Sequence, residues 1–368
     1  MAMTKRIDSI DLARGIVMVL MAIDHVRCYA GLPSGGPTAG IFFTRWVTHF
    51  CAPAFVFLAG TSAFLYGHRI QDPAKLAKYL VTRGLLLVLL EPTLIRFFWT
   101  FNVNYGQFVL AGVIWMLGWS MVLLAALVWM RPRTVGIIGL AIVLLQQLFH
   151  FLKIGWVMEF VYPVGFDTPP NINVLYTIVP WIGVMAAGYG FGAVVVREPA
   201  PRHRFYLRAG LSATAVFLVA AGLITAISPA EGEGPWLFRM LSPPKYPASQ
   251  PFLLMTLGPT IAMLPLFERG RGWLAGVFTT FGRVPMFYYL LHIPTIHIAA
   301  IITTLVRGEG VHPEWYATAP YTSVPDANQW SLGELYLVFF IVVTVLYFPC
   351  RWYARVKVTR PRWWMRYL

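Results

Sequence analysis

Two residues in the first hydrophobic segment could do chemistry together. Arg14 and His25 are separated by ten residues in a stretch that otherwise has the composition of a membrane span. A step of eleven residues returns to within about 20° of the same helical face and covers about 16 Å. Ionisable groups are costly in hydrocarbon, so this stripe is a candidate functional site that faces a polar interior. The alternative is that Arg14 marks the membrane boundary and His25 is a hydrogen-bonded packing residue.

Two carboxylates, Asp24 and Glu91, also fall within hydrophobic segments. Asp24 could pair with Arg27 at i and i+3, whereas a direct bond to the neighbouring His25 is not expected, because the two side chains point about 100° apart. A structural pair of Glu91 with Arg96 or Arg27 competes with a catalytic role.

Three further histidines lie in the hydrophobic segments: His49, His292 and His297. A neutral histidine can act as a general base towards a hydroxyl or an amine. Single histidines in helices are more often hydrogen-bonded packing residues. His292 is favoured over the other two because it follows Arg283 much as His25 follows Arg14.

The composition predicts an all-α polytopic membrane protein. Of 368 residues, 58% are hydrophobic and 12% are charged. Asp24, His25 and Arg27 interrupt the first apolar run, so we expect a retained span and not a signal peptide. We find no soluble domain or internal repeat, and expect one domain over residues 1–368. Hydrophobic runs predict about ten spans, at 9–31, 43–67, 79–101, 107–130, 134–152, 174–197, 206–229, 250–267, 282–306 and 333–353.

The net charge of +14 is unevenly distributed between alternate loops. If the N-terminus is cytoplasmic, most lysines and arginines lie on the cytoplasmic side, which predicts that both termini are inside. The charge therefore reflects topology, aided by anionic lipids, and does not imply nucleic-acid binding. It could also attract a phosphate-bearing cosubstrate. Cys28, Cys51 and Cys350 form no metal-binding pattern, so neither a metal site nor a disulfide is expected.

Four segments resemble a known family. The first, RIDSIDLARGIVMVLMAIDHVR, resembles the first-span signature of the transmembrane acyltransferase superfamily, with an arginine, ten residues and a histidine. The other three resemble a bacterial branch related to heparan-alpha-glucosaminide N-acetyltransferase. They are NVLYTIVPWIGVMAAGYGFG at 173–192, KYPASQPFLLMTLGP at 245–259 and FGRVPMFYYLLHIPTIH at 281–297.

The resemblance implies ten or eleven spans and a bacterial inner-membrane enzyme, with a homodimer as one possible assembly. It implies acetyl transfer from cytoplasmic acetyl-CoA to an amine or hydroxyl of a carbohydrate or glycolipid on the far side. The histidine motif in the first loop of the lysosomal enzyme is absent here, and His49 is only a rough substitute. On this basis the expected catalytic residues are His25 as general base, Asp24, Glu91, His49 and His292. The expected CoA-binding residues are Arg14, Arg83 and Arg283, and the expected acceptor-binding residues are Lys245, Tyr246, Arg45 and Arg96.

A second function is compatible with the same residues. A proton-coupled transporter or flippase for a polar or glycolipid substrate would also use buried carboxylates and histidines near midmembrane. The absence of inverted-repeat symmetry in the sequence disfavours it. A membrane scaffold without chemistry is the third interpretation. For the enzyme, direct transfer is simpler than an acyl-histidine intermediate, and the sequence leaves both open.

Overall fold

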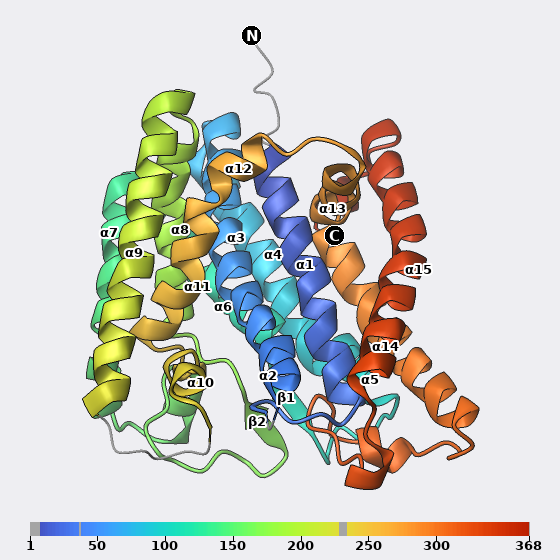
Figure 1. Ribbon diagram of the computed structural model, residues 1–368. Coiled ribbons are helices and arrows are strands. Elements are labelled where there is room, and N and C mark those ends of the chain that lie inside the picture. Colours follow the sequence, from blue (N-terminus) through green and yellow to red (C-terminus); the bar gives the residue numbers. More distant parts are fainter. Residues whose placement is uncertain (1–7, 37, 228–233, 368) are drawn as a thin grey trace. The chain divides into compact units, whose positions relative to one another are not determined.

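The computed structural model describes residues 8–36, 38–227 and 234–367, and this part of the chain is mostly α-helical (Figure 1). It forms two compact units. The first unit contains residues 52–93 and 105–265. The second contains the described residues of 7–51, 94–104 and 266–368. Each unit therefore combines segments that lie far apart in the sequence.

The second unit is built around four helices: α1 (Asp8–Tyr29), α13 (Trp273–Arg283), α14 (Pro285–Val306) and α15 (Leu332–Thr359). Two glycines let α1 and α13 touch. A Cβ atom on Gly15 would collide with the backbone of Phe278, and one on Gly282 with the backbone of Asp11. The shorter elements of this unit are α2 (Ala39–Trp46), η1 (Val47–Phe50), α5 (Arg96–Thr100), η5 (Pro313–Tyr316), η6 (Asp326–Asn328) and η7 (Trp363–Arg366).

The first unit is a bundle with one short pair of strands. Its helices are α3 (Cys51–Ile70), α4 (Pro73–Leu90), α6 (Val113–Leu127), α7 (Pro132–Leu144), α8 (Trp181–Val195), α9 (Pro199–Ile227), α10 (Trp236–Met240) and α11 (Gln250–Ala262). Gly84 and Gly118 allow close packing of α4 on α6, and Gly139 and Gly183 do the same for α7 on α8. Strands β1 (Val109–Ala111) and β2 (Ile172–Val174) are parallel. Elements η3 (Gln146–Phe151) and η4 (Trp156–Phe160) also belong to this unit. The π-helical turn η2 (Glu91–Ile95) and α12 (Leu264–Glu268) have residues in both units.

Local sequence explains where several helices begin. Asp72 caps α4 by accepting a hydrogen bond from the Lys75 backbone N–H at 3.0 Å. Ser331 and Glu334 form a capping box at the start of α15, in which each side chain accepts the other's backbone N–H. Pro285 lies in the first turn of α14, where its missing N–H costs nothing.

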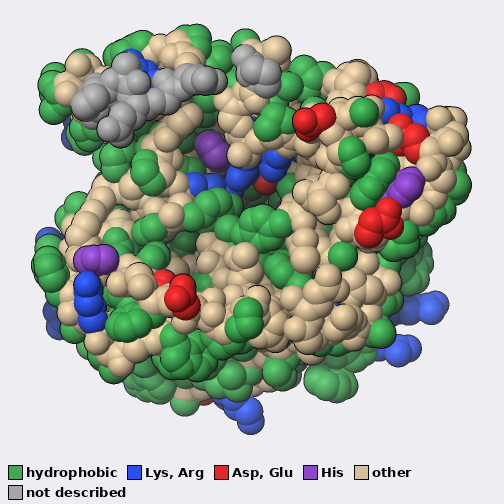
Figure 2. Space-filling view, turned by 90° about the horizontal axis from the view of Figure 1, so that it is seen from below, with side chains coloured by type: hydrophobic (Ala, Val, Ile, Leu, Met, Phe, Trp, Pro, Cys, Tyr) green, Lys and Arg blue, Asp and Glu red, His purple; other side chains and the backbone are tan. Residues whose placement is uncertain are grey.

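In the described part of the chain, five helical segments are long and apolar enough to cross a membrane. They are Ala39–Ile70, Pro199–Ile227, Gln250–Glu268, Pro285–Val306 and Leu332–Thr359. In the view from below in Figure 2, hydrophobic side chains lie among backbone and polar groups. Only 17% of the apolar stretch of α9 is buried within the protein. Such exposed apolar surface is expected against lipid and is rare on soluble monomers. The protein is therefore a helical membrane protein.

Each of the ten predicted segments contains an α-helix, although several boundaries differ. The segment predicted over 107–130 begins as β1, and α6 starts only after Gly112. Helix α8 likewise starts at Trp181, seven residues after the predicted 174. The segment predicted over 79–101 is interrupted by the π-helical turn that contains Pro92, which has no backbone N–H for a regular helix. Short backbone interruptions of this kind leave no trace in average hydrophobicity.

Candidate active site

His25 on α1 and His292 on α14 form a hydrogen-bonded pair in the second unit. His25 Nδ1 lies 2.7 Å from His292 Nε2, and the ring centroids are 4.8 Å apart. The other nitrogen of His292, Nδ1, lies 2.6 Å from the carbonyl oxygen of Tyr289. A carbonyl oxygen can only accept, so His292 carries its proton on Nδ1 and its Nε2 accepts a hydrogen bond from His25. In the neutral pair, this arrangement makes Nε2 the basic nitrogen of His25.

The two rings differ in exposure. His292 is fully buried, whereas His25 is partly exposed. The Trp99 ring meets His25 edge-on at 4.7 Å, and the Tyr288 ring stacks on His292 at 5.3 Å. The Tyr29 hydroxyl donates a hydrogen bond to the Trp99 carbonyl at 2.6 Å, which helps to position the Trp99 ring beside His25. The partly exposed His25 imidazole is thus oriented by the buried imidazole of His292.

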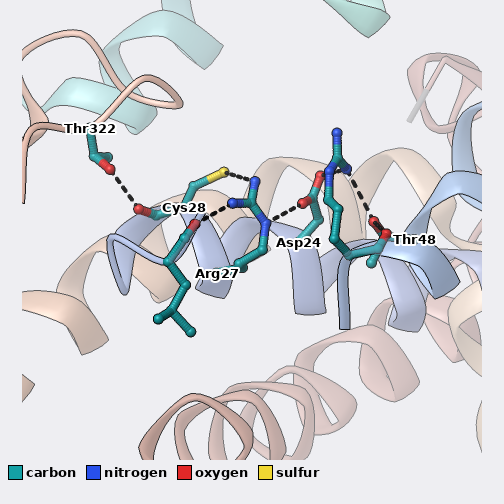
Figure 3. A network of polar contacts seen from close by, with 7 residues as sticks. Asp24, Arg27, Cys28, Thr48 and Thr322 are labelled. Carbon is teal, nitrogen blue, oxygen red and sulfur yellow. Dashed lines mark hydrogen bonds and ion pairs between the residues drawn. The ribbon is translucent and has the colours of Figure 1, made fainter. Parts of the chain in front are cut away.

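Asp24, one residue before His25, belongs to an ion cluster near the end of α1 (Figure 3). Its carboxylate accepts from Arg27 Nε at 3.0 Å and from Arg45 at 2.6 Å. The expected pairing of Asp24 with Arg27 is therefore confirmed. Arg45 also donates to Thr48 Oγ1 at 3.1 Å, and Arg27 donates to the Leu32 carbonyl at 2.5 Å. Two arginines thus share the Asp24 carboxylate in this largely buried cluster.

Arg14 lies where α1 meets the C-terminal end of α13. Its guanidinium is 3.3 Å from both the Asp11 carboxylate and the Gly282 carbonyl oxygen. A cation at a helix C-terminus interacts favourably with the helix dipole. Arg283 follows Gly282 and is exposed. Two of the three expected CoA-binding arginines thus lie at the same end of this unit. The third, Arg83, belongs to the first unit, where it donates to the Tyr79 hydroxyl at 2.7 Å.

Glu91 caps a helix in the first unit. Its carboxylate accepts the backbone N–H groups of Ile114 at 2.6 Å and Trp115 at 3.0 Å, in the first turn of α6. The N-cap residue of α6 is Gly112, which has no side chain to fill this role. The helix terminus therefore accounts for the buried Glu91 carboxylate, in place of the expected pair with Arg96 or Arg27.

Arg96 holds the turn that follows α5. Its guanidinium donates to the carbonyl oxygens of Asn102 and Asn104, the latter at 2.6 Å, and the residue is only 1% exposed. His297 is a packing residue, stacked on Phe101 with ring centroids 3.9 Å apart. His49, in η1, is partly buried.

Lys245 and Tyr246 lie in the first unit, on the segment before α11. The Lys245 ammonium lies 5.2 Å from the centre of the Tyr246 ring, and Tyr246 meets the Tyr176 ring edge-on at 5.3 Å. Tyr246 is 42% exposed. Among the described residues, no group of three or more histidine, cysteine or acidic side chains could hold a metal ion.

The sequence did not predict the direct bond between His25 and His292, nor the role of the Tyr289 carbonyl in it. The signal available was that each histidine follows an arginine in the chain, although Arg283 ends α13 and only Arg14 shares a helix with its histidine. Trp99 and Arg45 gave no specific signal as neighbours of this region, because their contacts depend on the packing of α5 and α2.

Comparison with known proteins agrees with the resemblance of the first-span segment and of residues 173–192, which lie within the matched range. Residues 6–224, more than half of the chain, match the family described as heparan-alpha-glucosaminide N-acetyltransferase, catalytic. No curated protein matches the chain. The matched residues include His25 and the Asp24 cluster, whereas His292 lies beyond them. The chain belongs to the heparan-alpha-glucosaminide N-acetyltransferase catalytic family.

Proposed function

We propose that the protein transfers an acetyl group from cytoplasmic acetyl-CoA to an amine or hydroxyl of a carbohydrate or glycolipid at the outer side of the membrane. Membership of the family supports acetyl transfer by a membrane protein. The observation that carries the proposal for this chain is the hydrogen bond from His25 to His292, because it places the basic nitrogen of a partly exposed histidine on Nε2.

In the proposed reaction, His25 Nε2 takes a proton from the acceptor amine or hydroxyl. The acceptor nitrogen or oxygen then attacks the thioester carbonyl carbon, and the carbon–sulfur bond breaks as the new amide or ester forms. The CoA thiolate leaves and recovers the proton from His25, so the base is regenerated. His292 orients the imidazole throughout. This is direct transfer without an acyl-histidine intermediate.

Arg14 and Arg283 are proposed to bind the CoA phosphates, with Arg83 in the same role. Arg14 and His25 are about 16 Å apart along α1, a distance that an extended pantetheine arm can span. A guanidinium has five N–H donors, so Arg14 can bind a phosphate and also retain Asp11. Lys245 and the exposed ring of Tyr246 are proposed to contact the sugar acceptor.

The proposal includes a topology. Ten spans with both termini in the cytoplasm of a bacterium agree with the distribution of lysines and arginines. The family match runs through segments of both units, which supports their action as one acyltransferase domain.

The decisive experiment compares His25→Ala and His25→Gln with the wild type in detergent. Turnover of acetyl-CoA is measured with a panel of amino sugars and sugar alcohols, alongside acetyl-CoA binding and thermal unfolding. Both variants should lose on the order of 10²- to 10⁴-fold in rate, since neither side chain can take the proton. Binding and unfolding temperature should stay close to wild type.

His297→Gln is the control, because it removes a different, buried histidine of the same unit. It should keep most of the turnover. Full turnover in His25→Ala would refute the assignment of the base. A wild-type protein that does not bind acetyl-CoA would refute the function itself.

A further inference from the structure

A groove whose lining includes three arginines lies along the N-terminal half of α9, in the first unit. It has a volume of about 510 Å³, and Arg197, Arg204 and Arg208 line it together with Phe205 and Ser212. No acidic residue lines it. Three like charges on one exposed face repel one another, so the groove favours an anion that they can share. Arginine is well suited to phosphate, because its planar guanidinium donates two parallel hydrogen bonds.

The same face of α9 continues as an apolar stripe. Steps of seven residues keep a helical face nearly constant, and they lead from Phe205 to Ser212 and Val219. Val216, Val219 and Leu223 on this face are 53%, 62% and 61% exposed. From Arg208 to Val219 the helix rises about 16 Å, close to half of the hydrocarbon thickness of a bilayer. A charged end and an apolar stripe of this length match the head and one acyl chain of a phospholipid.

We propose that this groove binds an anionic phospholipid, with the phosphate on the three arginines and an acyl chain along the stripe. A soluble phosphate would gain nothing from the stripe. A second copy of the chain, packed through the same face, would place its arginines next to the three groove arginines, and the like charges would repel. Basic residues next to a span attract anionic lipids in the same way, and each contributes roughly a 5-fold gain in affinity. The inference does not depend on the proposed enzymatic activity.

The test is lipid binding measured by native mass spectrometry of the purified protein in neutral detergent. Phosphatidylglycerol and phosphatidylcholine with identical acyl chains are compared. The wild type should bind phosphatidylglycerol more tightly. Arg204→Gln with Arg208→Gln should weaken that binding about 25-fold, since two charges are lost, and leave phosphatidylcholine unchanged. The matched control, Arg131→Gln with Arg133→Gln, removes two exposed arginines at the start of α7 and should bind like the wild type.

Three outcomes would overturn the proposal. The first is equal binding of phosphatidylglycerol by the wild type and the groove variant. The second is equally tight binding of glycerol phosphate or CoA, which would identify a soluble phosphate site. The third is a dimer that dissociates in the groove variant while lipid binding persists. Arg208→Lys keeps the charge, and its retention of phosphatidylglycerol would separate lost charge from poor folding of the double variant.

Discussion

His25 Nδ1 lies 2.7 Å from His292 Nε2, although 267 residues separate the two histidines in the chain. A carboxylate often takes this place behind a catalytic histidine, where it orients the ring and stabilises the imidazolium. In this protein the neutral imidazole of His292 orients the His25 ring, and the Tyr289 carbonyl fixes the tautomer of His292. His292 therefore orients the His25 ring without placing a negative charge beside it.

Replacing His292 should separate orientation from proton transfer. His292→Phe keeps a ring but removes the acceptor for His25 Nδ1, so kcat should fall on the order of 10²-fold as the wrong tautomer of His25 becomes populated. KM for acetyl-CoA should be unchanged. His292→Gln retains an acceptor oxygen and should recover most of the loss. Equal losses in the two variants, measured by steady-state acetyl transfer, would contradict an orienting role.

The Asp24 cluster should stabilise the fold strongly. Asp24→Asn leaves Arg27 and Arg45 buried without their carboxylate, and such loss of one partner costs about 3–5 kcal/mol. Arg45→Gln should cost less, because Asp24 keeps Arg27. Thermal unfolding in detergent measures both. Asp24→Asn combined with Arg45→Gln should recover part of the stability lost by Asp24→Asn alone, and a fully additive double variant would show that the charges do not interact.

Glu91 is expected to act on stability through α6. Glu91→Ala leaves the buried Ile114 N–H unsatisfied, at about 1–3 kcal/mol, and the partly buried Trp115 N–H without its acceptor at a smaller cost. Glu91→Gln keeps an acceptor oxygen and should cost less. Gly112→Ala should also destabilise, because its Cβ atom would lie 2.7 Å from the Glu91 carboxylate. Unfolding temperatures and activity per folded molecule are compared. Wild-type stability in Glu91→Ala, accompanied by lost activity, would return Glu91 to a catalytic role.

The loop after α14 should respond to pH through His312. The Glu314 carboxylate, which accepts a hydrogen bond from His312 at 2.7 Å, raises the pKa of His312 above 6.5, and the Glu309 carbonyl contributes. The pKa of Glu314 is lowered by its own backbone N–H and by His312. A raised histidine pKa stabilises the fold below the unfolded value, and this contribution is lost as pH rises through the folded value.

The pair is therefore intact from below the ordinary carboxylate pKa of 4.5 up to a pH above 6.5. Glu314→Gln should lower the unfolding temperature near pH 6 and have little effect near about pH 9, where His312 is neutral in both proteins. His312→Gln is the control and should remove the pH dependence of this difference. A larger effect of Glu314→Gln at high pH would contradict a raised pKa of His312.

The proposed topology predicts which loops react with an impermeant thiol reagent in intact cells. On a background without the three native cysteines, a cysteine at position 245 should be labelled, whereas cysteines at 72 and 200 should be protected. Labelling of 72 and 200, with 245 protected, would invert the orientation.

The sequence predicted the helical membrane class because composition and hydrophobic runs decide it. It also predicted the ion pair of Asp24 with Arg27, since neighbours one turn apart on a helix meet regardless of the tertiary fold. It could not predict that Glu91 caps α6, because that contact depends on which helix terminus the fold brings near. Nor could it predict that Arg45 joins Asp24, which requires α2 to pack beside α1.

The hydrogen bonds behind His25 end at the backbone carbonyl of Tyr289. A proton wire needs groups that accept a proton on one side and release another on the opposite side, and an amide carbonyl does neither at physiological pH. His292 can therefore orient His25, but it cannot transfer a proton further along this path. A proton taken up by His25 is therefore not passed on through His292. The pair cannot conduct protons along this path, which agrees with the proposed reaction, in which His25 returns its proton to the departing thiolate.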